Sequence, residues 1–220
     1  MLRYVLNADK EIIERTFAVQ SNSDSMYTTA FNVFPNSLMP VVLNTNLRII
    51  KKGIWGISEK KGVTTSAIDK DAILNNTKLA TSVQAHPCII PASGFYMWKK
   101  TVNDPLPFYV RRLSLPVLGL AGFYSEIIDK HGNSSIQFAV LTMPANVLLK
   151  PLEETMPCVL EPADFNAWLN GDIKNIIASK FKDTALIPDL AVYRVPDLVN
   201  DPSQNSKELI QPIPKLREDD

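Results

Sequence analysis

The sequence is poor in the residues that metal sites and disulfide frameworks require. It contains two cysteines and two histidines among 220 residues. Cys88 and Cys158 lie far apart without a framework spacing, which favours free, buried thiols in a reducing compartment. His86 and Cys88 would supply half of a tetrahedral zinc site, and no second pair completes it. We therefore expect no metal site and no cofactor.

Long apolar runs are also missing. No run approaches the roughly 20 residues that a membrane helix needs. The N-terminus turns polar at residues 7–11, before the apolar core of a signal peptide could form. These absences predict a protein that is not inserted in a membrane and that stays in the cytoplasm.

The chain lacks an excess of charge of one sign, with 23 basic and 23 acidic side chains. Residues 181–220 carry 5 basic and 8 acidic ones, which leaves 18 and 15 for residues 1–180. Basic pairs in this larger part would form a positive face if they gathered on one side. Solvated strand ends are the simpler interpretation of such pairs, so the composition does not by itself indicate a nucleic-acid binder.

Glycine is scarce and proline is frequent, with 8 against 16 residues. This balance is typical of many short elements with stiff connections. Apolar and alternating runs predict strands at 31–35, 40–43, 48–58, 107–112, 116–128 and 136–142, with a hairpin between the last two. Short helices are predicted at 10–17, 162–169 and 173–181, a loop at 59–70, and either helix or coil at 71–81. We predict one α+β domain, mostly antiparallel, with a single core and a disordered tail.

The chain is organised around residues 88–98, Cys-Ile-Ile-Pro-Ala-Ser-Gly-Phe-Tyr-Met-Trp. The pattern predicts a buried strand, a tight turn in which Gly94 takes a positive φ, and a second strand. In that strand Phe95 and Met97 face one side, whereas Tyr96 and Trp98 face the other. For Trp98 we expect plain core packing.

This stretch resembles the segment "RRCLIPASGFYEW" of the SOS-response-associated peptidase (SRAP) family. Other family segments appear in the same order, and they are matched by residues 3–4 ("MCGRY"), 32–35 ("YNIAPTQ"), 55–57 ("WGLIP"), 76–81 ("NARAET"), 107–110 ("PYYI"), 120–124 ("FAGLWE"), 138–146 ("FAILT…AN"), 156–160 ("HDRMPVIL"), 167–169 and 199–200. The resemblance implies a barrel-like antiparallel sheet flanked by short helices. We expect the SRAP-like domain to span residues 1–213 and the disordered tail to span 214–220.

The resemblance also implies a chemistry. SRAP proteins recognise abasic sites in single-stranded DNA and crosslink to them through an N-terminal cysteine. The cysteine amine attacks the ring-opened aldehyde, its thiol closes a thiazolidine, and asparagine, glutamate and histidine side chains handle protons. Here the matching catalytic positions are Met1, Leu2, Asn76, Met97 and Glu153.

Most of these positions have lost the family residue. Leu2 is too large for the usual removal of the initiator methionine, so we expect Met1 to be retained. Without a thiolate the site has no strong nucleophile, and Met97 cannot carry a proton as the family glutamate does. Glu153 is either a general acid or a surface glutamate beside Glu154. We expect the crosslinking and self-processing activities to be lost, and whether any enzyme activity remains is left open.

Three functions follow from these residues. The leading one is weak binding of single-stranded or abasic DNA in a DNA-damage context, with DNA contacts at Arg3, Asn32, Trp55, Lys78 and Thr155. Trp55 would stack on a base, and the cations would contact phosphates. The second is residual Schiff-base chemistry at abasic DNA through the Met1 amine. The third is a protein- or ligand-interaction module, because Met1, Leu2 and Met97 would make the old groove more apolar.

Overall fold

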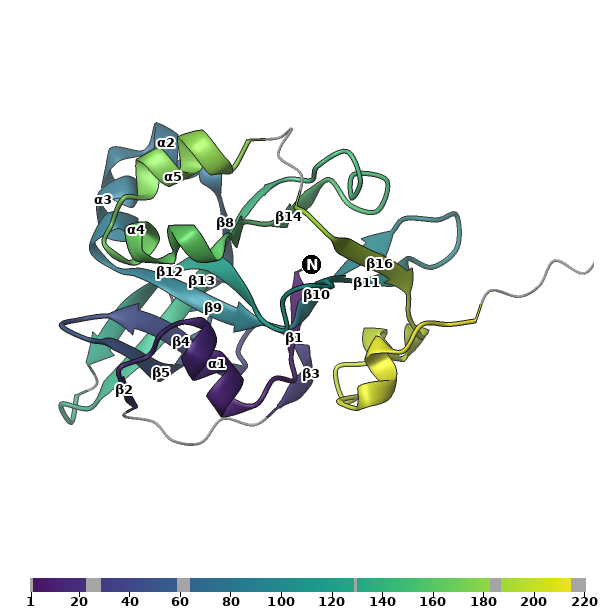
Figure 1. Ribbon diagram of the computed structural model, residues 1–220, viewed down its shortest axis with the longest axis horizontal. Coiled ribbons are helices and arrows are strands. Elements are labelled where there is room, and N and C mark those ends of the chain that lie inside the picture. The colour runs from purple at the N-terminus through teal and green to yellow at the C-terminus, as the bar shows by residue number, and fades with distance from the viewer. Residues whose placement is uncertain (1, 23–28, 59–63, 129, 183–186, 215–220) are drawn as a thin grey trace, which may run out of the picture.

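Five strands form a closed barrel in the computed structural model, which describes residues 2–22, 29–58, 64–128, 130–182 and 187–214 (Figure 1). The barrel strands are β4 (Leu38–Asn44), β5 (Arg48–Trp55), β9 (Pro87–Ala92), β12 (Leu118–Ile128) and β13 (Ser134–Pro144). They pair antiparallel in the order β13-β12-β9-β4-β5, and a parallel pairing between β5 and β13 closes the ring. The predicted barrel-like, mainly antiparallel architecture is confirmed, including the β12–β13 hairpin.

A second sheet carries the start of the chain. Its order is β16-β11-β10-β1-β3, and its strands are β1 (Arg3–Leu6), β3 (Ala30–Val33), β10 (Gly94–Lys99), β11 (Leu106–Arg112) and β16 (Leu190–Arg194). The organising stretch at 88–98 passes from the barrel strand β9 into β10 of this sheet. It is therefore a corner between two sheets, and β9 does not pair with β10.

Gly94 at this corner is required for a reason other than the predicted one. Its φ is not positive. A Cβ atom at Gly94 would lie 2.5 Å from the Tyr109 hydroxyl oxygen and 2.5 Å from the Val110 carbonyl oxygen. Glycine is needed because the neighbouring strand approaches so closely.

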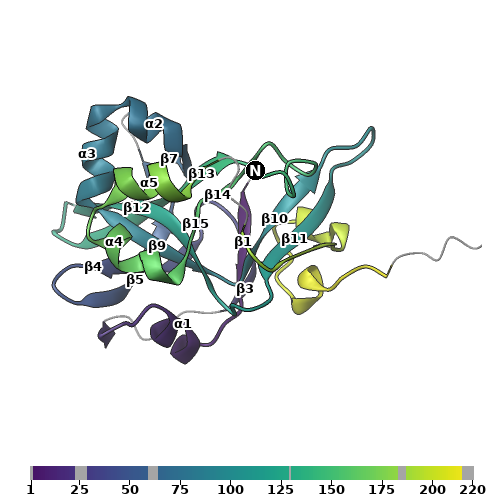
Figure 2. The same cartoon turned by 45° about the horizontal axis from the view of Figure 1, so that its top comes forward.

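Four helices, α2 to α5, gather on one side of the barrel, and α1 lies apart from them (Figures 1 and 2). The helices are α1 (Lys10–Thr16), α2 (Lys70–Asn75), α3 (Thr77–Ala85), α4 (Phe165–Leu169) and α5 (Ile173–Lys180), with 3₁₀ turns η1 (Pro162–Asp164), η2 (Asp197–Asn200) and η3 (Lys207–Ile210). The region 71–81 is helical, because Asn76 ends α2 and its side-chain oxygen caps α3 by accepting a hydrogen bond from the Leu79 amide. Within the described residues, no helix is both long and apolar enough to cross a membrane.

Short strands complete the fold. They are β2 (Ser21–Asn22), β6 (Ile57–Ser58), β7 (Thr64–Thr65), β8 (Ala67–Asp69), β14 (Thr155–Pro157) and β15 (Val159–Leu160). The prediction of a loop over 59–70 was wrong for its second part, since β7 pairs with β6 and β8 pairs with β13. Residues 215–220, which make up nearly all of the tail predicted to be disordered, lie outside the described residues.

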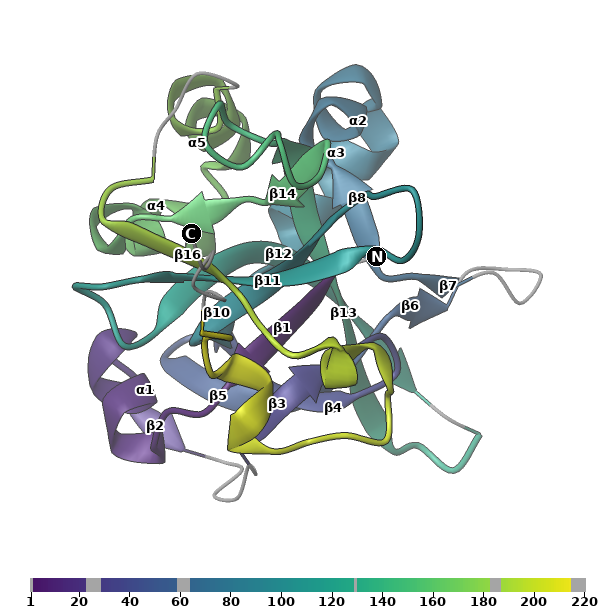
Figure 3. The same cartoon turned by 90° about the vertical axis from the view of Figure 1, so that its right-hand side faces the viewer.

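Apolar side chains form two clusters, where the sequence predicted one core. The larger cluster fills the barrel and the space under the helices. The smaller one lies between the five-stranded sheet and residues 195–213, here called the C-terminal strap, and contains Val5, Tyr96, Tyr109, Val195, Val199 and Leu209. Figure 3 shows the strap crossing in front of this sheet. The predicted alternation of β10 is confirmed, because Phe95 and Met97 join the larger cluster and Tyr96 the smaller.

Candidate functional site

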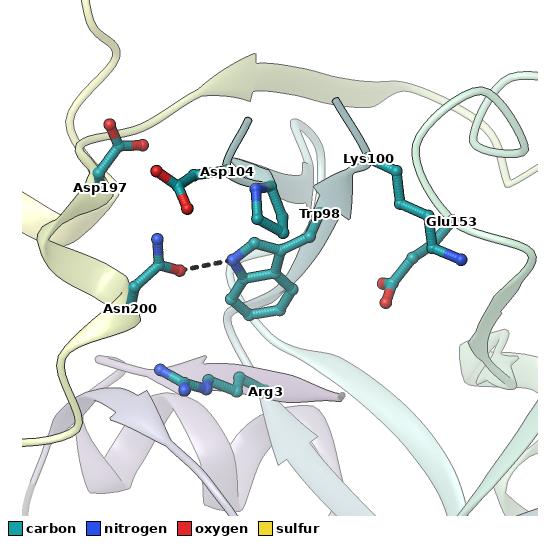
Figure 4. Close-up of a pocket in the computed structure, with 8 residues that line it drawn as sticks. Arg3, Trp98, Lys100, Asp104, Glu153, Asp197 and Asn200 are labelled. Atoms are coloured by element: carbon teal, nitrogen blue, oxygen red, sulfur yellow. Dashed lines mark hydrogen bonds between the residues drawn. The ribbon is translucent and has the colours of Figure 1, made fainter. Parts of the chain in front are cut away.

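A pocket of about 540 Å³ opens where β1 begins. Small-molecule sites typically have volumes of about 300–1,000 Å³. The β10–β11 hairpin forms one wall, the segment leading into β14 another, and the C-terminal strap a third (Figure 4). Its lining residues are Arg3, Trp98, Lys100, Asp104, Pro105, Glu153, Asp197 and Asn200. The pocket is thus built from four segments that are far apart in the sequence.

Trp98 is the central aromatic side chain of this pocket. It is half-buried, and its indole Nε1 donates a hydrogen bond to Asn200 Oδ1 at 2.7 Å. The guanidinium carbon of Arg3 lies 5.5 Å from the ring centroid, within the range of a cation–π contact (Figure 4). The ring is therefore held at its edge and on one side.

One guanidinium nitrogen of Arg3 is hydrogen-bonded within the protein. Arg3 Nη1 donates to the Val199 carbonyl oxygen and, at 3.4 Å, to Asn32 Oδ1. Burial lowers the pKa of the Arg3 guanidinium, but an arginine stays protonated at physiological pH. Arg3 keeps its positive charge in the pocket, with fewer N–H groups left for a ligand.

Asn32, expected to contact DNA, is instead a buried clasp. Its Nδ2 donates to the carbonyl oxygens of Val199, Asp201 and Gln204, each at 3.2 Å. The side chain is 5% exposed. Both ends of this amide are used within the protein, so Asn32 fixes the strap beneath the pocket rather than meeting a ligand.

Carboxylates outnumber cations around the pocket. Asp104, Glu153 and Asp197 line it, against Arg3 and Lys100. Glu153 is half-buried and lies on the side of Trp98 opposite Asn200 (Figure 4). Glu153, expected to be either a general acid or a surface glutamate, lines the pocket. This charge balance disfavours tight binding of a polyanion.

The two tryptophans exchange the roles that the sequence predicted. Trp55, expected to stack on a base, is fully buried in the barrel, where its Nε1 donates to the Ser66 carbonyl oxygen at 2.8 Å. Its ring packs 5.2 Å from that of Tyr4. Trp98, expected in the core, lines the pocket. The sequence did indicate this position. Trp98 points to the strand face opposite Phe95 and Met97, and two lysines follow it at the strand end.

Three other expected site residues lie outside the pocket lining. Asn76 and Lys78 are exposed at the start of α3, where Asn76 acts as the helix cap. Thr155 is exposed at the first position of β14, two residues beyond Glu153. The structure therefore brings together Arg3 and Glu153, with Asn32 hydrogen-bonded to Arg3, and leaves the other three outside the pocket lining.

Two of the positions that depart from the family residue, Leu2 and Met97, lie against the main core. Met97 is 1% exposed and packs in the main core. Leu2 is half-buried against the same core, and Met1 lies outside the described residues. Neither Leu2 nor Met97 lines the pocket at β1, and the expectation of a more apolar groove stays a prediction.

Both thiols are remote from this chemistry. Cys88 and Cys158 are fully buried, and burial raises the pKa of each thiol well above its usual value. Neither lines the pocket. A buried, protonated thiol is a poor nucleophile.

Comparison with known proteins agrees with this fold. A family model described as SOS response associated peptidase (SRAP) matches residues 2–202. The chain is 27% identical over 215 residues to abasic site processing protein YoqW of Bacillus subtilis (strain 168), with 91% of this chain and 94% of that protein covered. It is 24% identical over 212 residues to abasic site processing protein YMR114C of Saccharomyces cerevisiae, with 90% and 56% covered.

A solved structure shows the same architecture. A protein from Bacteroides thetaiotaomicron superposes with a TM-score of 0.80 at 17% identity, with 96% of this chain and 99% of that chain covered. A Bordetella bronchiseptica protein gives a TM-score of 0.72 at 18% identity, with 89% and 100% covered. Sequence match and fold agree over almost the whole length, and the chain belongs to the SRAP family.

Proposed function

We propose that this protein binds single-stranded or abasic DNA in a DNA-damage context, weakly and without forming a thiazolidine crosslink. Relatives that match it over about nine-tenths of its length are named abasic site processing proteins. The observation that carries the proposal is the pocket at the start of β1, where a held tryptophan ring lies beside Arg3 and Lys100.

The pocket offers the two kinds of contact that single strands use. A base next to an abasic site has lost one stacking neighbour, and the half-buried Trp98 ring that lines the pocket supplies a replacement. Arg3 and Lys100 contact the adjoining phosphates. The carboxylates of Asp104, Glu153 and Asp197 oppose this attraction, which keeps the affinity low.

The loss of crosslinking follows from the thiols. Thiazolidine formation needs an amine and a thiol on the same residue, at the aldehyde. The second residue of the chain is Leu2, and the two cysteines are buried away from the pocket. Met97 supplies no carboxylate, so the proton transfers of ring closure also lack one of their carriers.

Fluorescence anisotropy of a labelled single strand tests the binding. One strand carries a stable abasic analogue and its control is intact. If two cations contact phosphates, raising salt from 50 to 200 mM weakens binding by about sevenfold, from a slope of about 0.7 per contact. Lys100→Gln is expected to remove about half of that dependence, whereas Lys174→Gln, exposed on α5, is the matched control. Absence of binding at low salt, or binding indifferent to salt, would rule out the proposal.

A second candidate is imine formation between the Met1 amine and an abasic aldehyde. The position of Glu153 favours this reaction, because Glu153 and Arg3 line the same pocket. The Glu153 carboxylate would serve as the proton shuttle. Borohydride reduces an imine to a stable amine, so an adduct seen only after borohydride treatment would support this candidate. No adduct under reduction would eliminate it.

A further inference from the structure

A second cleft lies at the opposite end of the β10–β11 pair from Trp98. Its volume is about 390 Å³, and its walls come from the start of β10, the end of β11, β16 and the C-terminal strap. No aspartate or glutamate is among its lining residues, in contrast to the pocket at β1. The polar groups on its wall include Asn7, Ser93, Tyr109, Arg111 and Tyr193.

The strand pattern explains why these side chains meet. Tyr109 and Arg111 are two residues apart on β11 and therefore share a face. On that face Tyr109 is in register with Tyr193 of β16, and their ring centroids lie 5.8 Å apart, edge to face. The missing side chain at Gly94 leaves the space that the Tyr109 hydroxyl occupies. The glycine at the corner between the sheets thus shapes the cleft.

Two strong donors of the cleft have no hydrogen-bond partner within the described part of the chain: the Arg111 guanidinium and the Tyr109 hydroxyl. The adjacent Arg112 differs, because it donates to Glu161 at 2.9 Å and to Asp189 at 3.0 Å. Burial raises the pKa of the Tyr109 hydroxyl, which therefore remains a protonated donor at neutral pH. Ser93 Oγ accepts the Asn7 amide at 3.1 Å, which leaves its own hydroxyl proton to donate.

We propose that this cleft binds a nucleoside monophosphate, either free or as the 5′ end of a DNA strand. The phosphate accepts hydrogen bonds from Arg111, Tyr109 and Ser93, because a planar guanidinium matches phosphate geometry and both hydroxyl-bearing residues line the same cleft. The base packs against the half-buried ring of Tyr193. This site shares no lining residue with the pocket at β1, so it does not depend on the function proposed there.

Isothermal titration calorimetry with dTMP tests the site, with thymidine and inorganic phosphate as partial ligands. We expect dTMP to bind more tightly than either. Arg111→Gln is expected to weaken dTMP binding roughly tenfold or more, the usual effect of a lost charged hydrogen bond. Arg15→Gln, an exposed arginine on α1, is the matched control and should leave the affinity unchanged. No dTMP binding at millimolar concentration, or equal affinity in Arg111→Gln, would overturn the proposal.

Two further variants keep the test independent of folding and of the other pocket. Tyr109→Phe retains the buried ring and removes only the hydroxyl, so it should weaken dTMP binding without changing thermal stability in a dTMP-free sample. Trp98→Ala should leave dTMP affinity intact while affecting the pocket at β1. Unchanged affinity in Tyr109→Phe together with Arg111→Gln would refute the assigned phosphate contacts.

Competition distinguishes the two sources of the nucleotide. A 5′-phosphorylated oligonucleotide and the same strand without its phosphate are each used to displace dTMP. Displacement by the phosphorylated strand alone identifies a strand end as the ligand, and displacement by neither identifies the free nucleotide. Equal displacement by both strands would contradict recognition of a monophosphate.

Discussion

The indole nitrogen of Trp98 donates a hydrogen bond of 2.7 Å to Asn200, a residue 102 positions later in the chain. This bond joins the end of β10 to the C-terminal strap. The Arg3 contact with the Val199 carbonyl joins the start of β1 to the same turn. The pocket therefore forms only when the C-terminal strap lies against β1 and the end of β10.

Removing the partner of Trp98 should release its ring without unfolding the protein. Asn200→Leu deletes the acceptor at an exposed position, whereas Asn200→Asp keeps an oxygen there. Acrylamide quenching of tryptophan fluorescence reports on this ring, because Trp55 and Trp168 are fully buried. We expect stronger quenching in Asn200→Leu and near wild-type quenching in Asn200→Asp. Identical quenching in all three proteins would mean that Asn200 does not hold the ring.

Trp98 should contribute most of the base contact. Stacking of one base on an aromatic side chain is worth about 1–3 kcal/mol, so Trp98→Ala should weaken single-strand binding roughly 5- to 150-fold. Trp98→Phe keeps a ring and should recover part of the affinity. The measurement is anisotropy with the abasic strand at low salt. An affinity that survives Trp98→Ala would place the DNA elsewhere on the protein.

The Asn32 clasp should be a stability determinant. Asn32→Ala leaves three strap carbonyls without this donor in a buried setting, and we expect a loss of about 2–3 kcal/mol in the free energy of unfolding. Asn44→Ala removes one exposed hydrogen bond, to Asn170, and should cost less than about 0.5 kcal/mol. Urea titration followed by circular dichroism measures both. Equal midpoints for the two variants would argue against the clasp.

The buried thiols predict a loss of stability in alkaline solution. Burial raises the pKa of both thiols, so their contribution is complete below the unfolded pKa of about 8.5 and is lost as the pH rises above it. While both thiols stay protonated in the fold, the unfolding free energy should fall by about 2–3 kcal/mol between roughly pH 8 and 9.5.

The double variant Cys88→Ala, Cys158→Ala is the control for this prediction. It should be less stable at neutral pH, because two buried side chains are shortened, but its stability should change less over the alkaline range. Parallel curves for the wild type and the double variant would show that other groups cause the alkaline loss.

The barrel was predictable from local pattern, and the pocket was not. Strand alternation places Phe95 and Met97 together in the core, and the hairpin around residues 129–133 follows from its turn composition. The closing contact between β5 and β13 is a long-range parallel pairing that local periodicity does not report.

The pocket escaped prediction because its parts are brought together by the strap. Asn32 is polar and belongs to a family motif. Only its hydrogen bonds to three carbonyl oxygens of the strap show that its side chain is buried inside the protein. Trp55 lies in a family motif and was expected to stack on a base, yet it is buried inside the closed barrel. Asp197 and Asn200 enter the site from a 3₁₀ turn whose sequence gives no sign of a binding role.

The loss of crosslinking is tested by a denaturing gel of the protein incubated, without reductant, with single-stranded DNA that carries one natural abasic site. We expect protein and DNA to migrate separately after heating, while the same mixture shows a salt-sensitive complex on a native gel. A heat-stable adduct without borohydride would contradict this expectation, because crosslinking would then proceed without a cysteine at the start of the chain.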